Sequence, residues 1–348
     1  MSEAYLRPPT LGGSLRLDLN EAPWDAPAAF REAFLAFLGS RELRRYPPMD
    51  AAPVREAAAS LYGWEPAGTL VGNGSNELLA AALAVLAQGK TVLAFSPSFS
   101  VYPWLVRRAG GKLRPFPLSP PLFAFPGQAL LEAAAAAEVL LLCCPNNPTG
   151  GELPPSLWHR LLALGKPTIW DGAYWEFGSG GEVRPWLAAY PNLIVTRTLS
   201  KVWGVAGVRA GCLLAGPAMA ERIRRWQLPF SPGVAVWAAF AAAASMPQLA
   251  QERAAAVVAE RERQLAALAK IPGVEAVPSQ GNFYLLRVPG LSGPQLAQLL
   301  GEKGVVVREV EELAAAGYVR VTVGTPAEGD VLLAACQEVC HDIAHRAS

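Results

Sequence analysis

Four short motifs place polar side chains directly after apolar runs that are typical of β-strands. They are GNGSNE at 72–77, PNNPTG at 145–150, DGAY at 171–174 and TLSK at 198–201. Lys201 supplies an amine that can form a Schiff base, and Asp171 and Asn147 supply a carboxylate and an amide. Ser75 and Asn76 stand at the start of a predicted helix, where free N–H groups and the helix dipole favour an anion.

Each motif also has an ordinary structural interpretation when it is taken alone. Ser75 and Asn76 are typical helix-capping residues, PNNPTG is typical of a proline-fixed turn, and most lysines are solvated surface residues. Asp171 differs, because a carboxylate at the end of a buried strand needs a cationic partner. The four motifs in order indicate a site with a Schiff-base amine, a carboxylate, an amide donor and a phosphate cradle.

Alternating strand and helix patterns predict the scaffold that positions these groups. Candidate strands are Thr69–Val71, Thr91–Phe95, Lys112–Phe116, Val139–Cys144, Pro167–Trp170, Leu193–Arg197 and Ala210–Ala215. Segments of helical length such as Asn76–Gln88 and Pro155–Leu164 separate most of them. This alternation favours an α/β domain with a mostly parallel sheet, in which ligands bind at the carboxyl ends of the strands.

The pattern changes near residue 230 and indicates a second, α+β domain. We predict a helix over Gln248–Ile271, strands near Phe283–Val288, Gly304–Arg308 and Tyr318–Val323, and a terminal helix. We therefore divide the chain into an N-terminal arm with part of the small domain (1–40), a large domain (41–233) and a C-terminal small domain (234–348).

Composition limits the possible functions. The 348 residues are 52% hydrophobic and 17% charged with a net charge of +1, which favours a globular protein and gives no reason to expect nucleic acid or acidic lipid as a partner. The apolar run Val234–Ala244 is too short to span a bilayer and predicts a buried helix. No export signal is evident at the N-terminus, so we expect a cytoplasmic protein.

The cysteines indicate a reducing compartment. Their number is odd, their spacing is irregular, and we expect reduced thiols at Cys143, Cys144, Cys212, Cys336 and Cys340. Cys336 and Cys340 are followed at the same spacing by His341 and His345, but the segment has no CxxC-type signature and reads as a terminal helix. We predict no metal site.

The ordered motifs resemble those of the fold-type I aminotransferases of class I/II, which depend on pyridoxal phosphate (PLP). The resemblance covers almost the whole chain and rests on GNGSNE, PSFSVY (97–102), PNNPTG, DGAY, TLSK with GVR, and VRVTVG (319–324). LDLNEAP (17–23), RYP (45–47), SQGNF (279–283), GVVVR (304–308) and VRVTVGTP (319–326) are similar to the histidinol-phosphate aminotransferase subfamily. The implied fold is a large domain with a mostly parallel sheet between helices, plus a smaller α+β domain.

The resemblance implies a role for each matching cofactor-site residue. Lys201 would bind PLP covalently and later shuttle a proton, and Asp171 would pair with the pyridinium nitrogen. Asn147 and Tyr174 would hydrogen-bond the ring's 3′ oxygen, and Phe99 would stack on the ring. The residues implied around the phosphate, one of them contributed across a homodimer interface, are Ser75, Asn76, Thr198, Ser200, Arg209 and Tyr46 of the partner subunit.

The resemblance also implies the substrate contacts. Arg320 would bind the substrate α-carboxylate, and Arg308 would bind a substrate phosphate, since an arginine fork suits both oxyanions. Asn20 and Glu21 would lie in an arm that closes on the substrate. Alternatively, Arg308 is a surface residue paired with Glu309 or with Glu311.

The chain departs from the family pattern at several positions. Gly172 stands where the family usually has Glu, and Phe99 where it commonly has Tyr. Residues 229–232 read Pro-Phe-Ser-Pro in place of a PYN-type motif. Tyr5 is the nearest match to the N-terminal tyrosine of the family.

We therefore expect amino transfer between histidinol phosphate and 2-oxoglutarate, in histidine biosynthesis. Threonine-phosphate decarboxylase of cobalamin synthesis is the main alternative, because PSF (97–99) and WQLPFS (226–231) resemble it. An aromatic or general amino-acid aminotransferase is a weaker one. A non-catalytic PLP-binding regulator would need an added DNA-binding segment, and the chain has no spare basic module.

Overall fold

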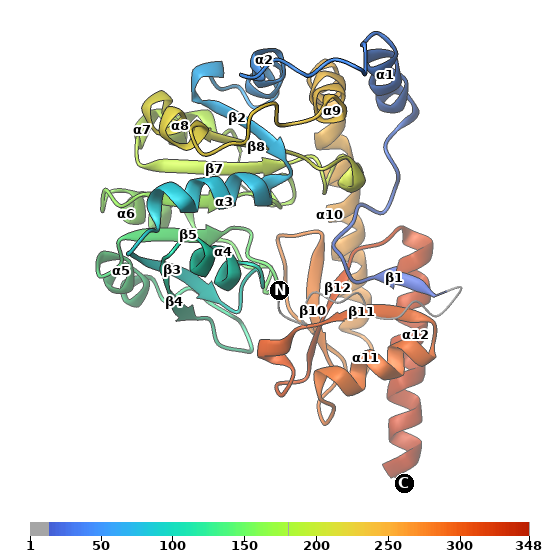
Figure 1. The fold of residues 1–348 in the computed structure, drawn as a ribbon. Coiled ribbons are helices and arrows are strands. Elements are labelled where there is room, and N and C mark those ends of the chain that lie inside the picture. The colour runs from blue at the N-terminus through green and yellow to red at the C-terminus, as the bar shows by residue number, and fades with distance from the viewer. Residues whose placement is uncertain (1–13, 180, 348) are drawn as a thin grey trace.

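The computed structural model describes residues 14–179 and 181–347 and contains two sheets (Figure 1). The larger has seven strands in the order β2-β8-β7-β6-β5-β3-β4. They are β2 (Thr69–Asn73), β3 (Thr91–Ser96), β4 (Lys112–Pro117), β5 (Val139–Cys143), β6 (Thr168–Asp171), β7 (Leu193–Thr198) and β8 (Ala210–Ala215). All seven predicted strands are confirmed, with ends that differ from the sequence-based bounds by at most two residues.

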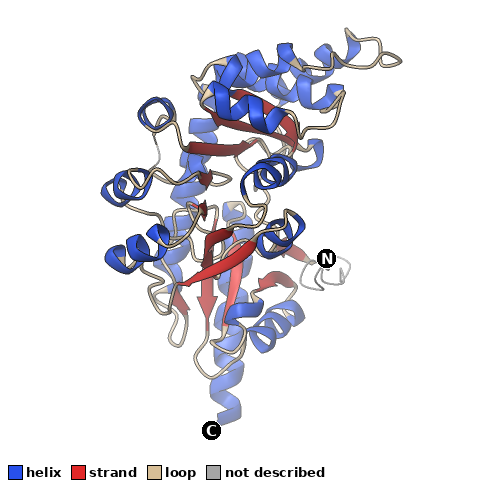
Figure 2. Cartoon of the chain, turned by 60° about the vertical axis from the view of Figure 1, so that its left-hand side comes forward, coloured by secondary structure: helices blue, strands red, loops and turns tan. Residues whose placement is uncertain are grey.

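The larger sheet is parallel except at β8, which runs antiparallel to both β2 and β7. Every residue of β5, β6, β7 and β8 is buried, as their continuous apolar runs require in a sheet covered on both faces. In Figure 2 the strands lie between layers of helices. The helices of this part are α1 (Ala28–Gly39), α2 (Ala52–Leu61), α3 (Ser75–Leu86), α4 (Tyr102–Arg108), α5 (Gly127–Ala135), α6 (Pro155–Leu162), α7 (Arg184–Ala189), α8 (Pro217–Arg224) and α9 (Val234–Ser245).

The smaller sheet has five strands in the order β1-β11-β12-β10-β9. They are β1 (Leu15–Leu17), β9 (Glu275–Ala276), β10 (Phe283–Arg287), β11 (Val305–Glu309) and β12 (Tyr318–Thr322). The helices α10 (Gln248–Leu268), α11 (Gly293–Glu302) and α12 (Pro326–Ala347) accompany it. The three strands and two long helices predicted here are confirmed, whereas β1 and β9 are too short to have produced a sequence signal.

Strand β1 and helix α9 connect the N-terminal part of the chain with segments that are distant in sequence. Strand β1 pairs in parallel with β11, so the N-terminal segment lies against the C-terminal half of the chain. Helix α9, the predicted buried helix, packs against α1, α2 and β8. The division at residues 40 and 233 stays a prediction, and residues 1–13 of the predicted arm, with Tyr5, lie outside the described residues.

The described residues include no helix that is both long enough and apolar enough to cross a membrane. Cys143, Cys144, Cys212, Cys336 and Cys340 form no disulfide with one another, as the sequence predicts.

Strand β8 passes very close to the start of α3. A Cβ atom on Gly211 would lie 2.4 Å from both the carbonyl carbon of Gly74 and the amide nitrogen of Ser75. These are backbone atoms, which cannot rotate away. Glycine at 211 is therefore required by the approach of β8 to the turn between β2 and α3.

We expect Gly211→Ala to lower the free energy of unfolding by about 1–3 kcal/mol, the usual cost of overpacking. Urea unfolding would measure it. Gly207→Ala is the matched control, because a Cβ at Gly207 meets nothing within 4 Å. Equal stability of the two variants would show that the β2–α3 turn can move to accommodate the Cβ atom without a cost in free energy.

Candidate active site

The polar motifs meet at one edge of the larger sheet. Strands β2, β3, β5, β6 and β7 are mutually parallel, so their carboxyl ends lie on the same side. Asp171 is the last residue of β6, while Asn147 and Lys201 follow β5 and β7 by a few residues. The edge therefore collects the carboxylate, the amide and the amine that the sequence identified.

Asp171 is buried and held by two neutral hydroxyl groups. Its side chain is part of a residue only 3% exposed. Tyr102 donates to Oδ2 at 2.7 Å, and Thr196, its neighbour on β7, donates to Oδ1 at 2.9 Å. Burial raises the pKa of the Asp171 carboxyl, and these hydrogen bonds offset only part of the rise. A cation placed beside Asp171 would restore its charged form.

The sequence analysis did not identify Tyr102 and Thr196. Tyr102 closes the PSFSVY motif, so a signal for it was present. Thr196 gave none, because its role depends on the register of β6 against β7. Phe99 packs edge-on against the ring of Tyr102 with centroids 5.5 Å apart, which places it next to this hydrogen-bonded pair.

Lys201 is a half-buried amine at the centre of the site. Its Nζ donates to the carbonyl oxygen of Leu19 at 3.2 Å and lies 5.7 Å from the ring centroid of Tyr174. Burial, with the nearby guanidinium of Arg320, lowers the pKa of Lys201 to about 7. A substantial share of the amine is therefore neutral and nucleophilic near neutral pH.

Tyr174 is buried between the two halves of the chain. Its hydroxyl accepts a hydrogen bond from Nδ2 of Asn20 at 2.9 Å, and its ring packs edge-on against Phe283 with centroids 4.8 Å apart. Burial raises the pKa of the Tyr174 phenol well above its ordinary value. The phenol therefore keeps its proton and can donate it in a hydrogen bond.

Arg320 on β12 is oriented by groups from two other segments. Nη1 donates to Oδ1 of Asn147 at 2.6 Å, and Nη2 donates to the carbonyl oxygen of Asp18 at 2.7 Å. Arg308 on β11 is its direct cross-strand partner. Directly opposite residues of an antiparallel pair point to the same face, so both guanidinium groups lie on the face that meets the site.

An anion cradle lies at the start of α3. Its first residue is Ser75, followed by Asn76, and the N-cap Gly74 supplies no side-chain cap, so the first amide groups can serve a ligand. A Cβ on Gly74 would lie 2.6 Å from Nη2 of Arg209, which shows how closely that guanidinium approaches. Glycine at 74 also suits its φ of +83°.

Two hydroxyl groups after β7 complete this corner of the site. Thr198 donates to Ser200 Oγ at 2.9 Å, and the backbone N–H of Ser200 donates back to Thr198 Oγ1 at 3.1 Å. This small turn leads directly into Lys201 and fixes where the lysine leaves the sheet. Both residues are buried.

Tyr46 lies apart from this cluster, whereas Glu21 lies at its margin, near enough to influence Lys201. Tyr46 is 81% exposed and contacts the ring of Phe230 at a centroid distance of 4.8 Å. Glu21 is exposed, although it adjoins the buried Asn20.

The packing around Gly172 gives a physical reason for one departure from the family pattern. A Cβ there would lie 3.0 Å from the carbonyl oxygen of Thr196 and 3.1 Å from the Trp175 ring. The guanidinium of Arg197 lies 4.9 Å from the centroid of that ring and pairs with Glu176 at 2.8 Å. A larger side chain at 172 would displace this packed ion pair.

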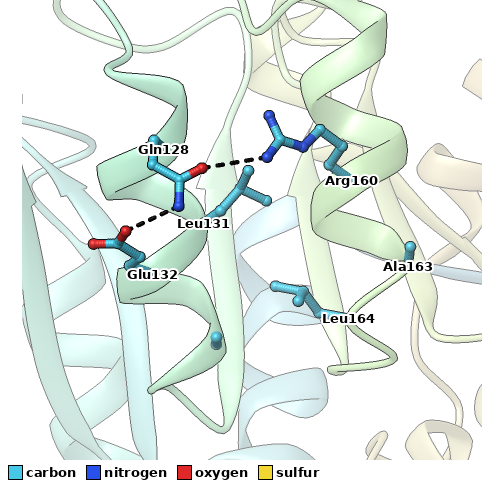
Figure 3. Close-up of a pocket in the computed structure, with 7 residues that line it drawn as sticks. Gln128, Leu131, Glu132, Arg160, Ala163 and Leu164 are labelled. Carbon is cyan, nitrogen blue, oxygen red and sulfur yellow. Dashed lines mark hydrogen bonds between the residues drawn. The ribbon is translucent and has the colours of Figure 1, made fainter.

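The hollow in Figure 3 is not part of this site. It measures about 400 Å³ and lies between α5 and α6. Gln128 bridges Glu132 and Arg160 there, and Leu131 and Leu164 form an apolar floor. None of the polar groups described above lines it. The candidate active site therefore lies at the strand edge and not in this hollow.

Comparison with known proteins agrees with the fold and the motifs. The family model described as aminotransferase class I and II matches residues 13–335. Histidinol-phosphate aminotransferase of Thermococcus gammatolerans is 36% identical, covering 93% of this chain and 92% of the relative. The enzyme of the same name from Deinococcus radiodurans is 35% identical, covering 92% and 90%.

Solved structures show the same fold. The histidinol-phosphate aminotransferase of Clostridium acetobutylicum gives a TM-score of 0.86 at 20% identity, covering 94% of this chain and 99% of that one. The Sinorhizobium meliloti protein of the same name, solved with pyridoxal-5′-phosphate, gives 0.81 at 23% identity, covering 94% and 91%. The predicted fold class is confirmed, and the chain belongs to the class I and II aminotransferase family.

Proposed function

We propose that this chain uses PLP to move an amino group between histidinol phosphate and 2-oxoglutarate, as part of histidine biosynthesis. The observation that carries the proposal is that Lys201 and Asp171 stand at one edge of the larger sheet, where Arg320 of the smaller sheet reaches Asn147. Arg308 is the direct cross-strand neighbour of Arg320. The relatives named above, which share more than a third of their residues with this chain, support the choice of substrate.

The residues of the site fit PLP. Asp171 is a buried carboxylate whose hydrogen-bond donors Tyr102 and Thr196 are neutral, which suits a protonated pyridine nitrogen. The α3 amides, Ser200 and Arg209 offer the donors that a phosphate needs. When bound, PLP withdraws electrons from the substrate Cα and so allows a bond to that carbon to break.

The protein groups would then act as follows. Lys201 would bind the cofactor covalently and carry a proton to and from the substrate Cα. Tyr174, kept protonated by its burial and oriented by Asn20, would donate a hydrogen bond to the ring's 3′ oxygen, together with Asn147. Arg320, held by Asn147 and Asp18, would bind the carboxylate of glutamate.

The lowered pKa of Lys201 has a consequence for stability. Between a pH of about 7 and its ordinary value of 10.5, the folded chain binds fewer protons at Lys201 than the unfolded chain does. Stability from this group therefore rises as the pH rises through that window and is lost as the pH falls through it.

We expect Lys201→Met in the cofactor-free protein to be stabilising, and more so near pH 7 than near pH 10, because it removes a buried charge. Urea unfolding at the two pH values would measure the difference. Lys270→Met is the control for the loss of an exposed lysine. A gain for Lys201→Met that is equal at both pH values would contradict the lowered pKa.

Arg308 is the residue that we assign to the phosphate of the substrate. It is half-buried and directly opposite Arg320. Like charges directly opposite each other destabilise a sheet, and an anionic group bound between the two arginines would offset that repulsion. The carboxylate of glutamate and the phosphate of histidinol phosphate would thus bind to side chains of two adjacent strands, β12 and β11.

We expect Arg308→Ala to raise the KM for histidinol phosphate by about 10- to 100-fold, the range for losing a hydrogen bond to a charged group. The KM for glutamate should change much less. Arg287→Ala is the control, since Arg287 lies on β10 of the same sheet and pairs with Glu275. If the two variants behaved alike, Arg308 would be an ordinary surface arginine.

The products decide between the aminotransferase and the decarboxylase. Histidinol phosphate with 2-oxoglutarate should yield glutamate, and threonine phosphate should release no carbon dioxide. Stoichiometric carbon dioxide from threonine phosphate without a keto acid would overturn the proposal, while the assignment of Lys201 would stand.

A homodimer with shared sites is also part of the proposal. Large apolar side chains are exposed on two segments, namely Leu43, Tyr46, Met49, Trp226, Leu228 and Phe230. The contact between Tyr46 and Phe230 joins the segments into one patch, which we call the 46/230 patch. Ser231 donates to Glu77 in the first turn of α3, so the patch adjoins the anion cradle. A partner's Tyr46 would thereby approach the phosphate.

The unpaired cysteine thiols suit a reducing compartment and support a cytoplasmic location.

We expect the wild-type protein to sediment as a dimer and Leu228→Glu to weaken that dimer by about tenfold or more, because it places a charge in an apolar interface. Leu122→Glu is a matched control, since Leu122 and Leu228 are each 74% exposed but Leu122 lies outside the 46/230 patch. A catalytically competent wild-type monomer would refute shared sites.

A further inference from the structure

Residues Asp18–Glu21, which we call the strap, form hydrogen bonds with functional groups of the site. The carbonyl oxygen of Asp18 accepts from Arg320 at 2.7 Å, and that of Leu19 accepts from Lys201 at 3.2 Å. The side chain of Asn20 donates to Tyr174 at 2.9 Å. Three candidate catalytic or binding groups are thus oriented by three consecutive strap residues.

The strap has a backbone conformation that needs external support. Asn20 has a φ of +51°, in the left-handed region that non-glycine residues seldom adopt. Such a residue persists only where its surroundings hold it. The backbone N–H of Asn20 donates to Thr322 Oγ1 at 2.9 Å, which fixes one side of the strap.

Asn282 fixes the other side. It is fully buried, immediately before β10, and its Nδ2 donates to the carbonyl oxygens of both Asn20 and Glu21, at 3.1 and 3.3 Å. The backbone carbonyl oxygen of Asn282 accepts a hydrogen bond from the N–H of Val323 at 2.9 Å, which anchors Asn282 to the end of β12. The side chain therefore ties the strap to the strand that carries Arg320.

The hydrogen bonds of Asn282 point to function as well as to stability. Among the described residues, no donor reaches its buried Oδ1. An apolar side chain would leave the carbonyl oxygens of Asn20 and Glu21 without this donor, so the amide serves the strap although its own oxygen is unpaired among the described residues. The two donated hydrogen bonds are what an apolar residue lacks.

We infer that Asn282 is a positioning residue for the reaction: it holds the strap so that Asp18 orients Arg320 toward a substrate carboxylate and Asn20 orients Tyr174. This inference rests on the proposed function for the identity of the carboxylate substrate. Without the amide, the strap loses two hydrogen bonds, and the left-handed Asn20 keeps only its hydrogen bond to Thr322. Arg320 would then keep Asn147 but not the fixed carbonyl of Asp18.

The test measures binding of succinate, an unreactive dicarboxylate, to the PLP-loaded enzyme by calorimetry. We expect Asn282→Ala to weaken succinate binding by about tenfold, the effect of losing one or two buried hydrogen bonds. The KM for glutamate should rise by a similar factor while kcat falls less. Asn282→Leu removes the donor, leaves no cavity and buries no charge, so it should have the same effect even if Asn282→Ala does not fold.

Asn192→Ala is the matched control. Its Nδ2 also donates to two carbonyl oxygens, those of Leu162 at 3.1 Å and Lys166 at 2.8 Å, but these lie outside the strap and the site. It should lower the melting temperature while leaving succinate affinity within about twofold of wild type, as distant sites act independently. Equal losses of succinate affinity in the Asn192 and Asn282 variants would overturn the inference.

Hydrogen exchange separates this inference from the proposed function. The amide of Asn20 should exchange faster in both Asn282 variants and at the wild-type rate in Asn192→Ala, because only the former release the strap. A wild-type enzyme that neither bound succinate nor used glutamate would count against the proposed substrates. Unchanged exchange at Asn20 in the Asn282 variants would instead reject the strap assignment, whatever the substrate.

Discussion

The site depends on the complete burial of the central strands. Residues of β5, β6, β7 and β8 are almost completely shielded from water, so a polar side chain within them needs a partner in the protein. Polar groups free to meet a ligand can therefore stand only where strands end. Because neighbouring strands run parallel, those ends share one edge, and Asp171, Asn147 and Lys201 converge without being close in sequence.

Burial also sets the electrostatics of that edge. It raises the pKa of Asp171 and lowers that of Lys201, so it moves both groups toward their neutral forms. The lowered pKa of Lys201 favours its role as a nucleophile, whereas the raised pKa of Asp171 works against its role as a negative charge. A lysine that gives up its proton near neutral pH is a better nucleophile, whereas a carboxylate must be charged to stabilise a cation. A ligand that brings its own cation to Asp171 and an electrophilic carbon to Lys201 answers both conditions, and PLP has both features.

The positions of the strands and the polar residues that follow them could be predicted from the sequence because they rest on local patterns. Each motif contains its own strand end, so the positions of Asp171, Asn147 and Lys201 followed from runs of apolar residues and the turns after them. The partners that tune these residues could not be predicted in the same way. Asn20 contacts Thr322 across 302 positions and Asn282 across 262, and such contacts depend on the register of β12 and β10. Gly172 likewise acquires its meaning only from Trp175 and Arg197, which fill the space beside it.

The hydrogen bonds of the strap connect the smaller sheet with the larger one. It continues from β1, which belongs to the smaller sheet, and it is fixed to that sheet by Thr322 and Asn282. Its other contacts, to Tyr174 and Lys201, belong to the larger sheet. Arg320 completes the connection, because it bonds to Asn147 on one side and to Asp18 on the other. A substrate carboxylate bound at Arg320 therefore acts on a guanidinium whose two orienting groups come from different parts of the fold.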